Sequence, residues 1–93
     1  MKENGIKFNL KDTLDNFPNG PISRNKLSVE SKIRAATISQ LYNGDAKAIQ
    51  FDTLVSILNA LNRLSLEEGD GRRYTIENII TYEAIEKDAP ARN

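Results

Sequence analysis

Hydrophobic and polar positions alternate with a helical period along most of the chain. One start signal recurs, in which an apolar residue precedes a predicted N-cap and a second one follows five positions later. Such a pair can pack across the first turn of a helix. The pattern occurs four times, in the pairs Ile22 and Leu27, Ile33 and Ile38, Ile49 and Leu54, and Tyr74 and Ile79. It predicts helices that begin near residues 23, 34, 50 and 75.

The residues at these four N-caps differ in quality. Ser23 and Thr75 are good N-caps, whereas Arg34 and Gln50 are poor ones, so the second and third starts depend on the apolar pair. Gly44 is predicted to end the helix that begins at residue 34, because glycine accepts the left-handed conformation of a helix end.

The other elements follow from apolar spacing. A first helix is predicted over residues 9–17, which "PNGP" ends. The helix from residue 51 is expected to reach Glu68, and a last helix is expected over about residues 75–87. The predicted fold class is therefore all-α, a compact five-helix domain that comprises the whole chain, residues 1–93.

Composition excludes several classes of protein. The 93 residues are 39% hydrophobic and 28% charged, which is typical of one globular domain. The chain has no apolar run of membrane-spanning length and no signal-peptide core. It has no cysteine, in keeping with the cytoplasm, and no histidine, which rules out the common zinc sites and Ser–His or Cys–His catalysis. We expect a cytoplasmic protein that is not an enzyme and needs no cofactor or metal.

The net charge of zero hides an asymmetry along the chain. Residues 22–50 carry five basic and two acidic side chains, whereas residues 51–93 carry five basic and eight acidic ones. A mildly basic segment beside an acidic one is compatible with binding to a polyanion.

The second and third predicted helices are separated by only about three residues around Lys32. So short a connection makes the two axes cross steeply, as in a helix-turn-helix. Ser28 is small where the second helix must let the third approach, and Lys26 is interpreted as a solvated charge.

The stretch "ISRNKLSVESKIRAATISQLYNG" followed by "IQFDTLVSILNALN" resembles the lambda-repressor/Cro-type (XRE-like) helix-turn-helix DNA-binding domains of small bacterial or phage transcriptional regulators. The resemblance covers about residues 22–62, with the motif core at residues 22–44. Two positions depart from the family pattern. Lys32 stands where glycine is usual, at a cost of about 1 kcal/mol if it is left-handed, and Arg34 stands where serine or threonine is usual.

The resemblance implies which residues contact DNA. If Ile38 and Leu41 are buried, the opposite face of the third helix carries the expected base contacts, namely Ala35, Ala36, Ser39, Gln40 and Asn43. Gln40 can pair with adenine, and the alanines can pack on thymine methyl groups. The expected phosphate contacts are Ser23, Arg24, Arg34, Thr37 and Lys47. Taken singly, Ser39 and Asn43 are better interpreted as solvated side chains than as base contacts. Thr37 can bind either a phosphate or its own helix backbone.

Three functions are compatible with these features. The first is a transcriptional repressor that occupies an operator on double-stranded DNA, and the second is the antitoxin of a toxin–antitoxin pair. The third is a protein-interaction module that does not bind DNA. A homodimer is expected, with an interface formed by one or both of two segments, "GIKF" near the N-terminus and the last helix through Ile76, Ile79, Ile80 and Tyr82. The alternative is that these residues complete the core of a monomer, and no membrane partner is expected.

Overall fold

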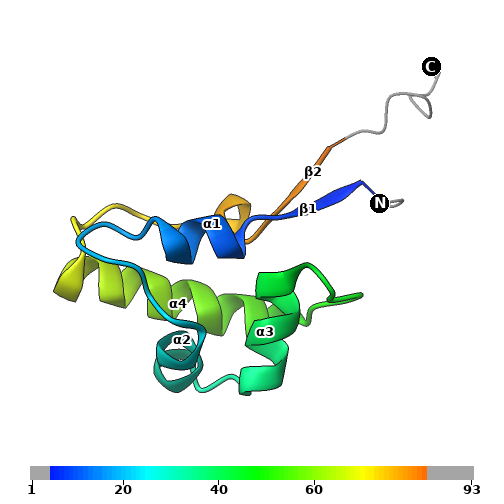
Figure 1. Ribbon diagram of the computed structural model, residues 1–93, viewed down its shortest axis with the longest axis horizontal. Helices are drawn as coiled ribbons and strands as arrows, with labels where there is room; N and C mark the ends of the chain where they lie inside the picture. The colour runs from blue at the N-terminus through cyan, green and yellow to red at the C-terminus, as the bar shows by residue number, and fades with distance from the viewer. Residues whose placement is uncertain (1–4, 84–93) are drawn as a thin grey trace.

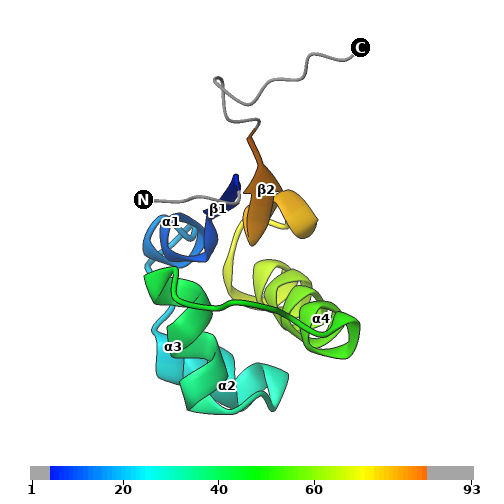
Figure 2. The same ribbon diagram turned by 90° about the vertical axis from the view of Figure 1, so that its right-hand side faces the viewer.

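A computed structural model describes residues 5–83 as a helical body with a short β-ribbon at one end (Figure 1). In chain order the elements are β1 (Ile6–Phe8), α1 (Leu10–Asp15), α2 (Arg24–Ser31), α3 (Ala35–Asn43), α4 (Phe51–Glu68), the 3-10 helix η1 (Ile76–Asn78) and β2 (Ile80–Tyr82). Seen nearly along α4, the helices α1, α3 and α2 lie along one side of it (Figure 2). The ribbon projects from the end of the body where α1 begins and α3 ends.

The predicted helix starts are confirmed for α2, α3 and α4, which begin directly after Ser23, Arg34 and Gln50. The Ser23 hydroxyl accepts a hydrogen bond from the Lys26 N–H at 2.9 Å, whereas Arg34 and Gln50 form no side-chain cap. The apolar residues that precede these two poor caps, Ile33 and Ile49, pack against the core. Apolar packing therefore supports the two starts that lack a capping side chain.

The core lies where the inner faces of the four α-helices meet the segment after α4. Its buried apolar residues are Leu10, Leu14, Phe17, Ile22, Leu27, Ile38, Leu41, Leu54, Ile57, Ala60, Leu61, Leu64, Tyr74 and Ile79. Asn62 of α4 binds the backbone of Tyr74 twice, accepting from its N–H at 2.7 Å and donating to its carbonyl at 3.1 Å. The amide thus holds the returning chain against α4, where the Tyr74 ring stacks on Phe17.

The prediction of a fifth helix over residues 75–87 is wrong within the described residues. Thr75 caps only the three-residue η1, and the chain continues as β2, which pairs with β1 in an antiparallel ribbon. Two side chains at the start of α1 explain this ending. Asn9, the N-cap, donates to the carbonyl of Glu77 at 2.8 Å, and Thr13 donates to the carbonyl of Asn78 at 2.6 Å. A continuing helix would use those carbonyls itself.

The fold is therefore four α-helices and a two-stranded ribbon over residues 5–83, and the all-α description is corrected. Residues 84–87 of the expected helix lie outside the described residues. Within residues 5–83, no helix has the length and apolar character needed to cross a membrane.

The four residues that were expected at a dimer interface differ in their solvent exposure. Ile79 is fully buried in the core of its own chain, so its placement at an interface was wrong. Ile80 is half-buried against that core. Ile76 and Tyr82 are 49% and 70% exposed and remain available to a partner.

Candidate nucleic-acid interface

The turn between α2 and α3 is held by side chains of α2. Lys32 ends α2 in the left-handed conformation, with φ of 61° and ψ of 29°. The Ser28 hydroxyl donates to the carbonyl of Ile33 at 2.6 Å, and the Ser31 hydroxyl accepts from the Ile33 N–H at 3.3 Å. Lys32 was identified beforehand as the residue at the turn position, whereas the hydrogen-bonding role of Ser28 was not identified.

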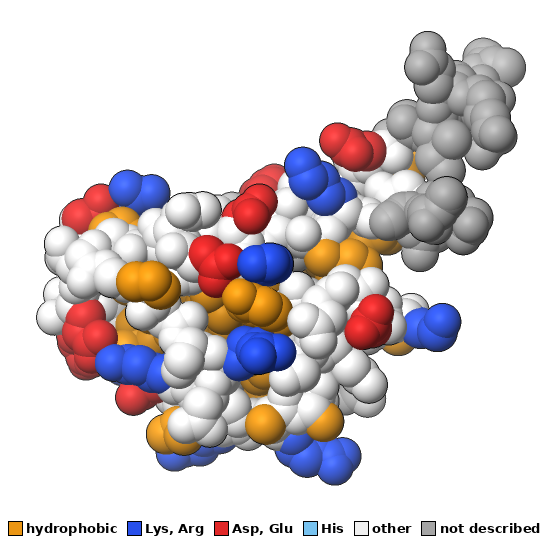
Figure 3. All heavy atoms as spheres, in the orientation of Figure 1, with side chains coloured by type: hydrophobic (Ala, Val, Ile, Leu, Met, Phe, Trp, Pro, Cys, Tyr) orange, Lys and Arg blue, Asp and Glu red, His pale blue; other side chains and the backbone are white. Residues whose placement is uncertain are grey.

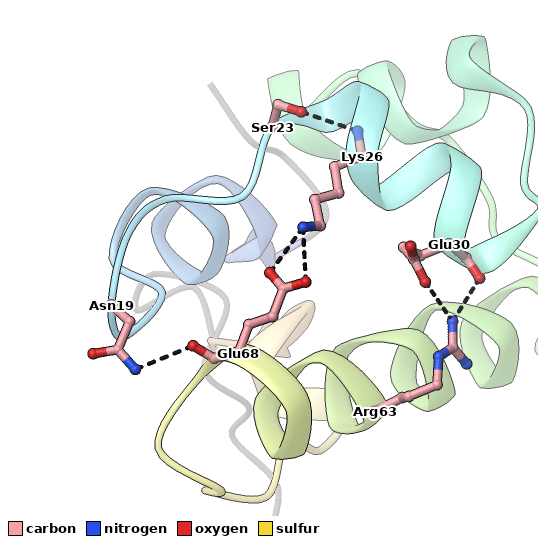
Figure 4. A network of polar contacts seen from close by, with 6 residues as sticks. All are labelled: Asn19, Ser23, Lys26, Glu30, Arg63 and Glu68. Atoms are coloured by element: carbon pink, nitrogen blue, oxygen red, sulfur yellow. Dashed lines mark hydrogen bonds and ion pairs between the residues drawn. The ribbon is translucent and has the colours of Figure 1, made fainter.

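Two ion pairs join α2 to α4 (Figure 4). The Lys26 ammonium lies 2.8 Å from a carboxylate oxygen of Glu68, and the Arg63 guanidinium lies 3.0 Å from the carboxylate of Glu30. Arg63 also donates to the Glu30 carbonyl at 2.9 Å. Lys26 is thus a solvent-exposed charge, as interpreted, and it also pairs with Glu68 across α2 and α4, which the sequence did not indicate.

The helix α3 buries one face and exposes the other. Ile38 is fully buried and Leu41 is 2% exposed, which places the five expected base-contact residues on the outer side. Ser39 is half-buried, and the other four are exposed, namely Ala35, Ala36, Gln40 and Asn43. Gly44 ends α3 in the left-handed conformation with φ of 79°, as predicted. The structure thus brings these five positions together on one face.

The expected phosphate-contact residues surround this face. Arg24, Arg34 and Lys47 are exposed and Thr37 is half-buried. Among the ion pairs of the described residues, none involves Arg24, Arg34 or Lys47. Ser23 is exposed, but its hydroxyl is occupied as the N-cap of α2. In Figure 3, Lys and Arg side chains lie along the lower rim, where Figure 1 shows α2 and the start of α3.

A groove of 410 Å³ lies between α3 and the start of α4. The groove is lined by three residues of the expected set, Arg34, Thr37 and Gln40. It is also lined by Gln50, the N-cap of α4, and by Thr53 from the first turn of that helix. Lys47 lies instead at a smaller apolar cleft of 160 Å³ between the β-ribbon and the loop that joins α3 to α4. The phosphate candidates are therefore distributed around α3 and do not form one pocket.

Sequence reasoning missed Tyr42, which is half-buried at the C-terminal end of α3. The Arg24 guanidinium carbon lies 4.8 Å from the centre of its ring, and the Lys11 ammonium lies 5.3 Å from it. The Tyr42 hydroxyl donates to the Asp15 carboxylate at 2.8 Å, and Lys11 pairs with Asp15 at 2.9 Å. Only the spacing of Lys11 and Asp15, four positions apart on a helix, could have been noticed beforehand.

The pKa values in this cluster are shifted toward the charged forms. The hydrogen bonds from Lys11 and Tyr42 hold the pKa of the Asp15 carboxyl below its ordinary value. The hydrogen bond to Asp15 raises the pKa of Lys11 above its ordinary value. The Asp15 carboxylate and the Lys11 ammonium are therefore charged together at neutral pH.

Comparison with known proteins agrees with this geometry. Residues 21–63, which span α2, α3 and the first two thirds of α4, match the model of the Cro/C1-type helix-turn-helix DNA-binding domain. No curated protein and no solved structure matches the chain. The segment of residues 21–63, which carries the exposed polar face of α3, is therefore similar to the Cro/C1-type helix-turn-helix DNA-binding domains.

Proposed function

We propose that this protein recognises a specific sequence in double-stranded DNA and represses transcription by occupying an operator. The observation that carries the proposal is the outer face of α3, where small and uncharged hydrogen-bonding side chains are exposed. They lie next to Arg24 and Arg34, which take part in none of the ion pairs of residues 5–83. It lies inside the segment that matches a DNA-binding family.

Base recognition falls to the outer face of α3. The first two residues of α3, Ala35 and Ala36, have short side chains, so the helix backbone can approach the floor of the major groove. Their methyl groups suit contact with thymine. Gln40 can form paired hydrogen bonds with adenine, and Ser39 and Asn43 supply further uncharged donors and acceptors along the same face.

Phosphate contacts fall to the residues that flank this face. Arg24 begins α2 and Arg34 immediately precedes α3, so both cations stand at helix starts, where backbone N–H groups also favour an anion. Three further residues are proposed to contact phosphates. They are Ser23 at the N-cap of α2, Thr37 through its hydroxyl, and Lys47 as a cation in the loop after α3. Glu30 pairs with Arg63, so its carboxylate does not neutralise the charge of Arg24 or Arg34.

A homodimer fits this function, because a single reading helix gives weak binding and two half-sites one helical turn apart give strong binding. The proposed contact surface is the exposed part of the C-terminal segment and ribbon, with Ile76 and Tyr82 at its centre and Ile80 at its edge. An operator-binding repressor of this kind would act in the cytoplasm.

The exposed apolar side chains of α4 favour a second candidate, in which the domain also binds another protein, as an antitoxin does. Phe51 and Val55 are 83% and 54% exposed, and their spacing of four positions puts them on one face of α4. A partner on this face would distinguish an antitoxin or an interaction module from a simple repressor.

The test is binding to a mixed pool of short duplexes over a series of salt concentrations, for wild type, Arg34→Ala and Gln40→Ala. Arg34→Ala should weaken binding to all sequences and lower the slope of log K against log salt by about 0.9. Gln40→Ala should relax selection at one base position, with a loss of about 1–3 kcal/mol in discrimination.

Two exposed residues away from α3 serve as matched controls, Arg73→Ala for the charge and Asn59→Ala for the amide. Both should retain wild-type affinity and selectivity. If no duplex is retained even at low salt, the DNA-binding proposal is wrong and the search moves to proteins that contact Phe51 and Val55.

A further inference from the structure

Tyr42 stands at one edge of the proposed base-reading face. Successive residues of an α-helix are rotated by about 100°. Tyr42 therefore lies next to Ala35 and Ser39, and Thr37 lies at the opposite edge next to Gln40. The residues that border a reading helix are the ones that face the phosphates along the two walls of the major groove.

A cation from the neighbouring helix α2 lies over the ring of Tyr42. The guanidinium of Arg24, the first residue of α2, lies over the ring at 4.8 Å from its centre. A cation in this position is attracted by the negative face of the ring. The contact fixes a long side chain that would otherwise sample many rotamers, and it brings Arg24 to the edge of the α3 face.

The surrounding charges leave Arg24 available to an external anion. The nearest carboxylate in the cluster, Asp15, already accepts hydrogen bonds from Lys11 and from the Tyr42 hydroxyl. Among the ion pairs of residues 5–83, none involves Arg24. A cation over the face of a ring is attracted by the ring and not held by hydrogen bonds, so the N–H donors of Arg24 stay available for the oxygens of a phosphate.

We propose that Tyr42 is a positioning residue for DNA binding, which holds the Arg24 guanidinium ready for a backbone phosphate at the edge of the reading helix. The proposal rests on the proposed DNA-binding function and assigns a role to a side chain that does not itself contact bases. The hydroxyl of Tyr42 serves a separate purpose, since it binds Asp15 and keeps that carboxylate directed at Lys11.

The first test measures the contact in the free protein by NMR. The ring current of Tyr42 should shift the side-chain N–H and methylene protons of Arg24 upfield in wild type and in Tyr42→Phe, which keeps the ring. The shift should vanish in Tyr42→Leu. Arg24 protons at the same position in wild type and Tyr42→Leu would overturn the proposal, whatever the protein binds.

The second test is a double-mutant cycle on duplex affinity with Tyr42→Leu and Arg24→Ala. Tyr42→Leu alone should weaken binding about two- to fivefold, as expected for an exposed cation–ring contact. In the Arg24→Ala background it should cause no further loss, and Tyr42→Phe should retain wild-type affinity. Leu58→Ala is the control for lost packing, because Leu58 is half-buried in α4 and should lower the melting temperature without changing affinity.

The outcomes separate the two proposals. If wild type binds DNA but Tyr42→Leu has the same effect with and without Arg24, the positioning role is wrong and the DNA-binding function stands. If Tyr42→Phe weakens binding as much as Tyr42→Leu, the ring does not carry the effect and the role is again wrong. If wild type binds no duplex, both proposals are wrong.

Discussion

Replacing Lys32 by glycine is expected to stabilise the protein, because Lys32 ends α2 with φ of 61° and ψ of 29°. In this left-handed conformation the Cβ atom crowds its own backbone, and glycine has no Cβ. The turn is otherwise fixed by Ser28 and Ser31, whose hydroxyls bind the backbone of Ile33. Those hydrogen bonds do not involve Lys32, so the substitution should leave the turn in place.

The size of the effect follows from two opposing terms. Relief of the left-handed conformation is worth about 1–2 kcal/mol. Glycine also gives the unfolded chain more backbone freedom, which offsets about 0.5–1 kcal/mol of that gain. The net stabilisation should be about 0.5–1 kcal/mol. For a domain of 93 residues, this corresponds to a rise of roughly 2–8 °C in Tm.

The assay is thermal and urea unfolding followed by far-UV circular dichroism, with two controls. Lys32→Ala removes the charge but keeps a Cβ, so it should not stabilise. Lys47→Gly makes the same replacement at an exposed loop lysine outside the left-handed region, and it should lower stability. The reasoning about backbone strain is refuted if Lys32→Gly behaves like Lys32→Ala, or if it lowers Tm.

Three further predictions concern the interface and its support. Ser28→Ala removes the donor to the Ile33 carbonyl and should cost about 1 kcal/mol in urea unfolding, more than Ser56→Ala on α4. Gly44→Ala should cost about 1–2 kcal/mol in the same assay, because its φ is 79° although a Cβ would find room. The pKa of Asp15 is lowered on folding from an ordinary value of 3.8, so its contribution to stability is present above that pH and is lost as pH falls through the lower folded value. Unfolding measured over a pH series should therefore show a smaller loss at acid pH for Asp15→Asn than for wild type; an equal loss would contradict the role of this carboxylate.

The helix starts were predictable because their signals are short-range. A cap and an apolar pair involve residues within two turns of one another, and α2, α3 and α4 begin where those pairs indicated. The exposed face of α3 was predictable for the same reason, since the burial of Ile38 and Leu41 decides which side chains point outward. The assignment of that face to DNA bases remains a prediction.

The last element was not predictable from its own residues. The pattern of Ile76, Ile79 and Ile80 fits a helix, and Thr75 does cap a turn there. The outcome depended on Asn9 and Thr13 from the other end of the chain, which take the carbonyls of Glu77 and Asn78. A distant segment therefore overrode a local helical pattern.

The sequence by itself determined where α2, α3 and α4 begin, which of their faces are apolar, and that a steep helix pair presents a small, uncharged surface. Only the tertiary structure decided that residues 80–82 form a strand, that Lys26 pairs with Glu68, and that Arg24 lies over Tyr42. The physical reason is the range of the interactions. Caps and periodic burial act within a turn or two, whereas Lys26 and Glu68 lie 42 positions apart and meet only after α2 has packed on α4.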